Sequence, residues 1–276
     1  MKKFKMNGRI VLFSSIIIIC IISIAVILYQ GLFVERKKEG NGKIQTGPIE
    51  LGEELVLKEE FSSKFDNKMT GKLDQVKKKD DTKEIVYTAM SSTEKKEGQY
   101  ELNVSVPVIN LPGEEIKSMN EDIQNTFLKK AISILAKTES NTIYSVKYTA
   151  CIYEGILSLG VHATLKEGDN PQRVIINTYN YNIEEQKKID LEEMLSLKGV
   201  SKKDAASKIL DDIKDENKKA LALSELGYSV YIRDYASDMY KIENSDNFLL
   251  DKNGYLYIIY AYGNSKYTSE TDLVIF

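Results

Sequence analysis

One long apolar segment near the N-terminus constrains this chain more than any other feature. All residues from 10 to 34 are uncharged, and residues 10–29 read IVLFSSIIIICIISIAVILY. A helix of that length spans about 30 Å, which is the thickness of the hydrocarbon core of a bilayer, whereas the apolar core of a cleavable signal peptide is usually only about 7–15 residues. Residues 10–34 are therefore expected to form a retained transmembrane signal-anchor, with the lipid bilayer as their partner.

The charges on the two sides of this segment predict its orientation. Four cations precede it, namely Lys2, Lys3, Lys5 and Arg9, and the first acidic residue is Glu35. The positive-inside rule then places residues 1–9 in the cytoplasm and the rest of the chain outside, as a single-pass protein of the cell membrane. The whole chain has 38 Lys and Arg against 41 Asp and Glu, so the part beyond the segment keeps 34 against 41, a net charge of −7.

Composition excludes several classes of protein. A polybasic nucleic-acid binder would need an excess of Lys and Arg, and a disordered tail would have far fewer apolar residues than the 42% found here. One histidine and two cysteines cannot build a multi-histidine metal site or a disulfide framework. We therefore expect no metal, no cofactor and no nucleic-acid partner.

Beyond the anchor, the expected organisation is a tether and one domain. Residues 35–60 begin with a stretch rich in charge, Gly and Asn and are assigned to an extended tether. Residues 61–276 are long enough for one domain and show no internal repeat, with subregions at about 83–168 and 169–276.

Apolar periodicity in this domain predicts an α+β fold with a mainly antiparallel sheet and packed helices. Expected strands cover residues 83–90, 100–108, 142–153, 156–166, 173–183, 247–250, 255–262 and 271–276. Helices are expected from Glu114, from Asp190 and from Ser201, with a further helix through Leu221 that ends at Gly227. Two-residue alternation places His162 on the polar face of its strand.

Few residues could carry chemistry. His162 is the only imidazole and Cys151 the only thiol beyond the anchor, and no motif of a known hydrolase or metal site accompanies either of them. We expect a surface histidine and a buried free cysteine, although a catalytic role is conceivable for each. Paired acids such as Asp211 and Asp212 stand beside lysines, which favours solvated helix faces over paired catalytic carboxylates. No catalytic residue is assigned, and a non-enzymatic protein is expected.

Tyrosine is more suggestive, because 14 of the 17 tyrosines lie beyond residue 140. A tyrosine ring offers a large contact area and its hydroxyl tolerates water, so exposed tyrosines suit an interface with a protein or a glycan. Tyrosine is also a good strand former and could simply fill the sheet. The candidate ligand-binding residues are His162, Tyr179, Tyr181 and Tyr257.

Three passages carry a resemblance to a known family. They are VPVINLPGEEIKSMNEDI, NTYNYNIEEQKKIDLEEML and FLLDKNGYLYIIYAYGNSKYTSETDLVIF. In this order over residues 83–276 the chain resembles the RsiV-like extracytoplasmic domain family, which joins two domains of unknown function, the first also found in PdaC-type peptidoglycan deacetylases. The passage HATLKEGDNPQRV departs from the Gly-Gly-Ala-His-like turn of many relatives, so loop contacts are expected to differ.

The resemblance implies recognition. In an anti-sigma factor of this family such an ectodomain binds lysozyme, so a lysozyme-like protein or peptidoglycan is the expected ligand of a membrane-anchored sensing or binding protein in a bacterial cell envelope. A wall-modifying enzyme or its accessory domain is an alternative. An anti-sigma regulator is a further one, disfavoured because residues 1–9 are too few to fold around a sigma factor.

Overall fold

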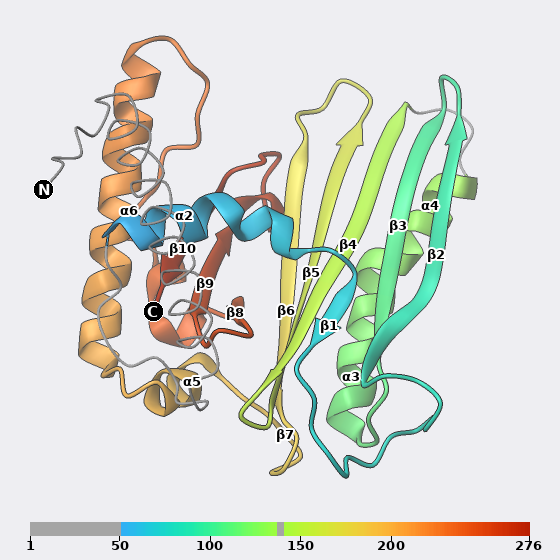
Figure 1. Ribbon diagram of the computed structural model, residues 1–276. Coiled ribbons are helices and arrows are strands. Elements are labelled where there is room, and N and C mark those ends of the chain that lie inside the picture. The colour runs from blue at the N-terminus through green and yellow to red at the C-terminus, as the bar shows by residue number, and fades with distance from the viewer. Residues whose placement is uncertain (1–50, 137–140) are drawn as a thin grey trace, which may run out of the picture. The chain divides into compact units, whose positions relative to one another are not determined.

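The computed structural model describes residues 51–136 and 141–276 of the chain. The strands are β1 (Lys68–Thr70), β2 (Val86–Lys96), β3 (Tyr100–Ile109), β4 (Thr142–Tyr153), β5 (Ile156–Glu167), β6 (Arg173–Asn182), β7 (Lys187–Lys188), β8 (Phe248–Leu250), β9 (Leu256–Ala261) and β10 (Thr271–Ile275). The helices are α2 (Leu51–Glu60), α3 (Glu114–Ile123), α4 (Lys129–Ala136), α5 (Leu191–Leu197) and α6 (Lys202–Glu225), and the short helical turns are η1 (Phe61–Lys64), η2 (Gln124–Leu128), η3 (Asp238–Tyr240), η4 (Ile242–Asn244) and η5 (Tyr262–Asn264). Figure 1 shows a large and a small sheet, with helices against both.

The large sheet has seven strands in the order β2-β3-β4-β5-β6-β7, and β1 pairs with β4 outside this path. The pairs β2–β3, β4–β5, β5–β6 and β6–β7 are antiparallel, whereas β3–β4 and β1–β4 are parallel. A parallel pair needs a crossover, and here α3, η2 and α4 connect β3 to β4. The predicted α+β fold with a mainly antiparallel sheet is confirmed.

Turn chemistry explains the register of the central hairpin. Glu154 and Gly155 join β4 to β5 with φ values of +48° and +79°. Positive φ at both central residues is the conformation that a tight hairpin turn requires. The hairpin of β2 and β3 is longer than expected, because Ser91–Lys96 continues β2 instead of forming the predicted turn. Its residues are mostly exposed, and an exposed strand needs no apolar alternation.

The helices α3, η2 and α4 cover one face of the large sheet. Ile116, Ile123, Phe127 and Ala131 are fully buried against it, as the predicted helical stripe required. The buried Asn120 side chain bonds both the N–H and the C=O of Ile109, which fixes the helix to β3.

The small sheet has the order β10-β9-β8 and packs α5 and α6 on one face. Asp190 and Glu193 form the predicted capping box at the start of α5. The two helices predicted between Ser201 and Leu226 are one continuous helix, α6. After it Gly227 has a φ of +87°, and the N–H of Tyr228 bonds the carbonyl of Leu223, so the predicted helix end at Gly227 is confirmed.

The N-terminal strap, residues 51–67, crosses the opposite face of the small sheet (Figure 1). Its residues 51–60, which we expected in the tether, form α2 instead. Leu57, Phe61 and Phe65 recur every four residues and are buried beside β8 and β9. Burial of these three apolar side chains stabilises the helix. The charged residues between them make the apolar pattern hard to recognise in the sequence.

The predicted division of the chain into subregions, anchor and tether can be compared with the structure only in part. Strand β6 pairs with β5 over ten residues, so the large sheet continues across the expected subregion boundary near residue 168. Residues 1–9, the predicted span 10–34 and the first part of the tether lie outside the described residues. Within residues 51–136 and 141–276, none of the helices combines the length and the apolar character that a membrane crossing needs.

Candidate ligand-binding site

Three of the four predicted site residues are buried tyrosines. Tyr179, Tyr181 and Tyr257 are at most 7% exposed and pack within the hydrophobic clusters of the two sheets. The hydroxyl of Tyr179 donates to Asp122 over 2.6 Å and that of Tyr257 donates to Asp251 over 3.2 Å. Burial raises the pKa of both phenols, and the neighbouring carboxylates raise it further. These tyrosines lie mainly inside the sheets, while parts of Tyr179 and Tyr181 line two cavities of about 670 and 570 Å³.

His162 lies on the face of β5 that was expected to be polar and open, but the N-terminal strap covers this face. The ring centroid of Phe65 is 5.1 Å from that of the imidazole, and a Cβ atom added at Gly160 on the same strand would lie 3.2 Å from both Phe65 and Leu249. Burial lowers the pKa of His162, and the cross-strand neighbour Lys147 lowers it further. His162 is therefore half-buried beside Phe65 rather than fully exposed.

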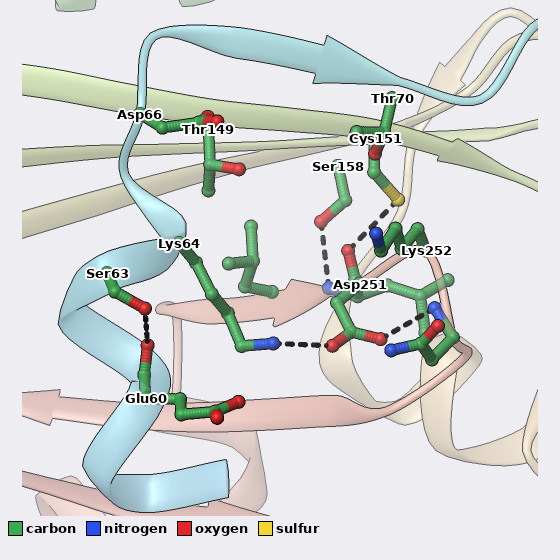
Figure 2. A pocket seen from close by; sticks show the side chains of 13 residues that line it. Glu60, Ser63, Lys64, Asp66, Thr70, Thr149, Cys151, Ser158, Asp251 and Lys252 are labelled. Atoms are coloured by element: carbon green, nitrogen blue, oxygen red, sulfur yellow. Dashed lines mark hydrogen bonds and ion pairs between the residues drawn. The ribbon is translucent and has the colours of Figure 1, made fainter. Parts of the chain in front are cut away.

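Cys151 is buried, as predicted, and its thiol donates to the carbonyl of Leu250 over 3.3 Å. Burial raises its pKa to about 12, so the thiolate is strongly disfavoured (Cys151 is labelled in Figure 2). Several acidic residues form ion pairs with lysines, for example Asp212 with Lys208 at 2.9 Å. In the part of the chain that the structure describes, no group of three or more His, Cys, Asp or Glu side chains could hold a metal ion.

A second group of tyrosines is exposed. The loop that follows α6 carries Tyr228, which is 64% exposed, and Tyr235, which is 48% exposed. Tyr267, between η5 and β10, is 59% exposed. Large apolar side chains seldom gather on the surface of a soluble domain without a binding role, and Leu226 and Ile232 of the same loop are exposed as well.

Of these exposed residues, Tyr267 lines a cavity of about 360 Å³, which we call the tyrosine cleft, and the half-buried Tyr231 lines it as well. Three connections that are distant in sequence line it: residues 171–172 between β5 and β6, residues 229–231 after α6, and residues 267–270 before β10. All three connections lie in the upper half of Figure 1. Aromatic rings come from Tyr231 and Tyr267, and polar groups come from Gln172, Ser229, Thr268 and Glu270.

The rim of the cleft is fixed by Arg173. Its guanidinium donates to the carbonyl of Gly263 through Nε at 2.9 Å and Nη2 at 2.7 Å. It also lies 5.2 Å from the ring centroid of Tyr267, within the range of a cation–π contact. One face of the Tyr267 ring is thus held in place while the side chain stays largely exposed.

A buried polar network holds Tyr231, one of the two tyrosines of the cleft. Arg233 bonds both carboxylate oxygens of Asp272, at 2.9 and 2.7 Å. The hydroxyl of Tyr262 donates to the same carboxylate over 2.6 Å, and burial together with Asp272 raises the Tyr262 pKa. Tyr231 stacks on Tyr262 with the ring centroids 4.2 Å apart. The loop after α6 is therefore tied to β10 and presents its aromatic side chains from a defined position.

Such a cleft is better suited to binding a ligand than to catalysing a reaction. Aromatic faces contact apolar parts of a ligand, and hydroxyl, amide and carboxylate groups fix its orientation. Glu270, the acid of the cleft, is 3.5 Å from Arg233. The sequence signal for the site was the spacing of Tyr228, Tyr231 and Tyr235 by three and four residues, which is a helical spacing, although these residues lie in the loop after α6. Sequence reasoning missed it because buried strand tyrosines give the same composition.

Comparisons with known proteins give limited information. No family model matches the chain, and no curated protein matches it. A solved DUF3298 family protein of Pseudomonas aeruginosa PAO1 is similar with a TM-score of 0.39 and 11% identity, over 68% of this chain and 88% of that one. A DUF3298 family member of Bacteroides fragilis NCTC 9343 has a TM-score of 0.31 and 12% identity, over 58% and 74%. Both neighbours are described as DUF3298 proteins, and the RsiV-like assignment stays a prediction.

Proposed function

We propose that this protein is a membrane-anchored, extracytoplasmic ligand-binding protein of a bacterial cell envelope, and that the tyrosine cleft recognises the glycan strand of peptidoglycan. The observation that carries the proposal is the pair of tyrosines Tyr231 and Tyr267, of which Tyr267 is largely exposed, in a polar cleft of about 360 Å³ beside a buried hydrogen-bonded network. A rigid aromatic site loses little conformational entropy when its ligand binds.

The chemistry of the cleft favours a sugar chain. The C–H face of a pyranose ring can stack on a tyrosine, and its hydroxyl and acetamido groups can bond Gln172, Ser229 and Thr268. Neither contact requires a charge on the ligand.

A protein ligand is the second candidate. The exposed apolar surface continues outside the cleft along α6, over Leu221, Leu223 and Leu226, and then over Ile232 and Tyr235. Such a surface could contact a lysozyme-like protein, which is the ligand that the sequence resemblance implies.

Binding measurements on the full chain in detergent micelles separate these candidates. One arm uses a peptide-free oligosaccharide of alternating N-acetylglucosamine and N-acetylmuramic acid, and the other uses lysozyme. Saturable oligosaccharide binding is expected, with Tyr231→Ala and Tyr267→Ala each weakening it by about tenfold or more, which is the effect of losing about 1.4 kcal/mol.

Ile132→Ala on α4 is the matched control, because Ile132 is 53% exposed and lies outside the cleft. Its affinity should equal that of the parent chain. Oligosaccharide binding that neither tyrosine substitution weakens would refute the assignment to the cleft. Binding of lysozyme alone would favour the protein candidate.

A further inference from the structure

A second cavity, of about 350 Å³, lies between the N-terminal strap and the rest of the domain. We call it the junction pocket (Figure 2). The strap contributes Glu60, Ser63, Lys64 and Asp66 to its wall. The body contributes residues of β4 and β5 and the turn between β8 and β9, residues 251–253. The pocket exists only while the strap is docked, since its walls come from both parts.

The carboxylate of Asp251 has a structural role in this pocket. One carboxylate oxygen of Asp251 accepts a hydrogen bond from the Lys64 ammonium over 2.9 Å and another from the Tyr257 hydroxyl over 3.2 Å. Its other oxygen accepts the backbone N–H groups of Asn253 and Tyr255 over 2.9 and 3.1 Å. These four bonds hold the turn against the strap, and the positive charge of Lys64 compensates the buried negative charge of Asp251.

The other charged side chains are divided by sign across the cavity. Glu60 and Asp66 belong to the strap, and Lys252 belongs to the opposite wall, as Figure 2 shows. Thr149 and Ser63 add hydroxyl groups between them. A ligand with an ammonium at one end and a carboxylate at the other would find an opposite charge for each end.

We propose that the junction pocket binds a small zwitterion, namely a free amino acid or a dipeptide. Its carboxylate would lie toward Lys252 and its ammonium toward Glu60 and Asp66. The volume of about 350 Å³ is at the lower end of ligand pockets, about 300–1,000 Å³, which suits a ligand of this size. The site differs from the tyrosine cleft in place and in chemistry, so it stands independently of the proposed function.

Occupancy of this pocket would also clamp the strap to the domain. The strap, residues 51–67, overlaps the end of the predicted tether, residues 35–60. A ligand that contacts both walls binds only the docked form. By linkage, such a ligand shifts the local equilibrium toward docking. The same ligand would therefore stabilise the junction between the domain and its predicted anchor.

The test uses the full chain in detergent micelles and dialanine as the probe, in its L,L and D,D forms. Calorimetry should show saturable binding of at least one form. N-acetyl-dialanine lacks the ammonium and dialanine methyl ester lacks the carboxylate, so each should bind about tenfold more weakly or worse, as expected when a charge-assisted hydrogen bond is lost.

Two exposed side chains test the assignment without disturbing the framework. Glu60→Gln and Lys252→Met should each weaken dialanine binding by about tenfold, the loss expected for one charged contact. Glu59→Gln, on the adjacent exposed position of α2, and Lys266→Met, on a distant loop, are the matched controls and should bind normally. Thermal unfolding of each variant shows that the fold is intact.

Hydrogen exchange provides an independent measurement. Amides of the strap between residues 53 and 64 should exchange more slowly in saturating dialanine, while those around the tyrosine cleft should not change. The proposal is overturned if neither form of dialanine binds saturably, if the acetylated and esterified compounds bind equally well, or if the control variants lose as much affinity as the pocket variants. Binding without protection of the strap would refute the clamping step.

Discussion

At the scale of single residues, burial separates the tyrosines into two groups with different roles. Tyr179, Tyr181 and Tyr257 lie inside the sheets, where their hydroxyls need partners, and two of them donate to carboxylates. Tyr228 and Tyr267 are mostly exposed. Strand propensity explains the first group, whereas the second group sits in loops where it adds nothing to a sheet. A candidate binding residue is thus better identified by its position outside the sheets than by its type.

The buried imidazole of His162 makes stability depend on pH. Its pKa in the fold is lower than the ordinary value of about 6.5, so below pH 6.5 the unfolded chain takes up a proton that the native state resists. The contribution of His162 to stability is therefore complete above pH 6.5 and is lost as the pH falls toward the lowered native pKa.

We expect His162→Gln to remove this dependence. Urea unfolding at pH 7.5 and pH 5 measures the free energy of unfolding of both chains, and the advantage of the parent chain should shrink or reverse at pH 5. Other titrating groups are common to both chains and cancel in the difference. An equal difference at the two pH values would contradict the buried, neutral imidazole.

At the scale of elements, the sequence predicts what depends on local pattern and misses what depends on packing. The strict alternation from Leu157 to Leu165 predicted β5 to within a residue of its observed end. Gly227 indicated the end of α6, because the residue that follows a helix often adopts a left-handed backbone conformation, which glycine favours. The pattern could not show that the strap covers the second face of β5 near His162, since Phe65 and its partners there are nearly 100 residues apart.

The loop after α6 depends on the Arg233–Asp272 pair, and its loss should be costly. Arg233→Met would leave Asp272 buried without its cation, and breaking a buried pair on one side costs about 3–5 kcal/mol. The double variant Arg233→Met with Asp272→Leu should lose less than Arg233→Met alone, because no uncompensated charge remains. Urea unfolding monitored by circular dichroism measures both.

The exposed pair Lys95–Glu101 provides the comparison for this prediction. Its side chains are 70% and 50% exposed, and removal of an exposed pair changes stability by about 0–1 kcal/mol. Lys95→Met should therefore leave the unfolding midpoint nearly unchanged. If Arg233→Met behaves like Lys95→Met, the pair does not anchor the loop.

At the scale of the whole domain, two sheets meet at a seam that sequence patterns do not reveal. Arg173 and Ile176 of β6 bond Gly263 and Asn264, which follow β9. The tyrosine cleft lies over the same seam, and its successive connections, 171–172, 229–231 and 267–270, are 57 and 36 residues apart in the sequence. The sequence of a loop does not indicate which other loops lie beside it in the fold. The tyrosine cleft could therefore be identified only from the structure.

Gly263 is a sensitive position in this seam. A Cβ atom there would lie 2.0 Å from the carbonyl oxygen of Val174 and 2.7 Å from that of Thr268. Both contacts are with backbone, which cannot move aside as a flexible side chain can. Gly263→Ala should lower the free energy of unfolding by about 1–3 kcal/mol or more, as overpacking does.

Gly52→Ala is the control, because nothing lies within 4 Å of a Cβ at Gly52 and the position is helical. Alanine favours a helix over glycine by about 1 kcal/mol, so this variant should be neutral or slightly stabilised in thermal unfolding. Equal melting temperatures for the two variants would mean that the two sheets do not meet tightly at Gly263.

Membrane topology is the prediction at the largest scale, and the cysteines of the chain make it measurable. Cys20 lies in the predicted span and Cys151 is buried with its pKa raised to about 12 from 9.0, which lowers the thiolate fraction about a thousandfold. A membrane-impermeant maleimide should therefore not label the parent chain in intact cells. Asn170→Cys, in the exposed turn between β5 and β6, should be labelled in intact cells because that turn is expected outside.

Gly8→Cys supplies the opposite test, since residue 8 is predicted to lie in the cytoplasm. Its thiol should react only after the membrane is made permeable, whereas Cys151 should react only after denaturation. Labelling of the Gly8 variant but not the Asn170 variant in intact cells would reverse the orientation and place the tyrosine cleft in the cytoplasm, where it could not meet a wall glycan. The proposed function and the predicted anchor are therefore tested together by these two thiols.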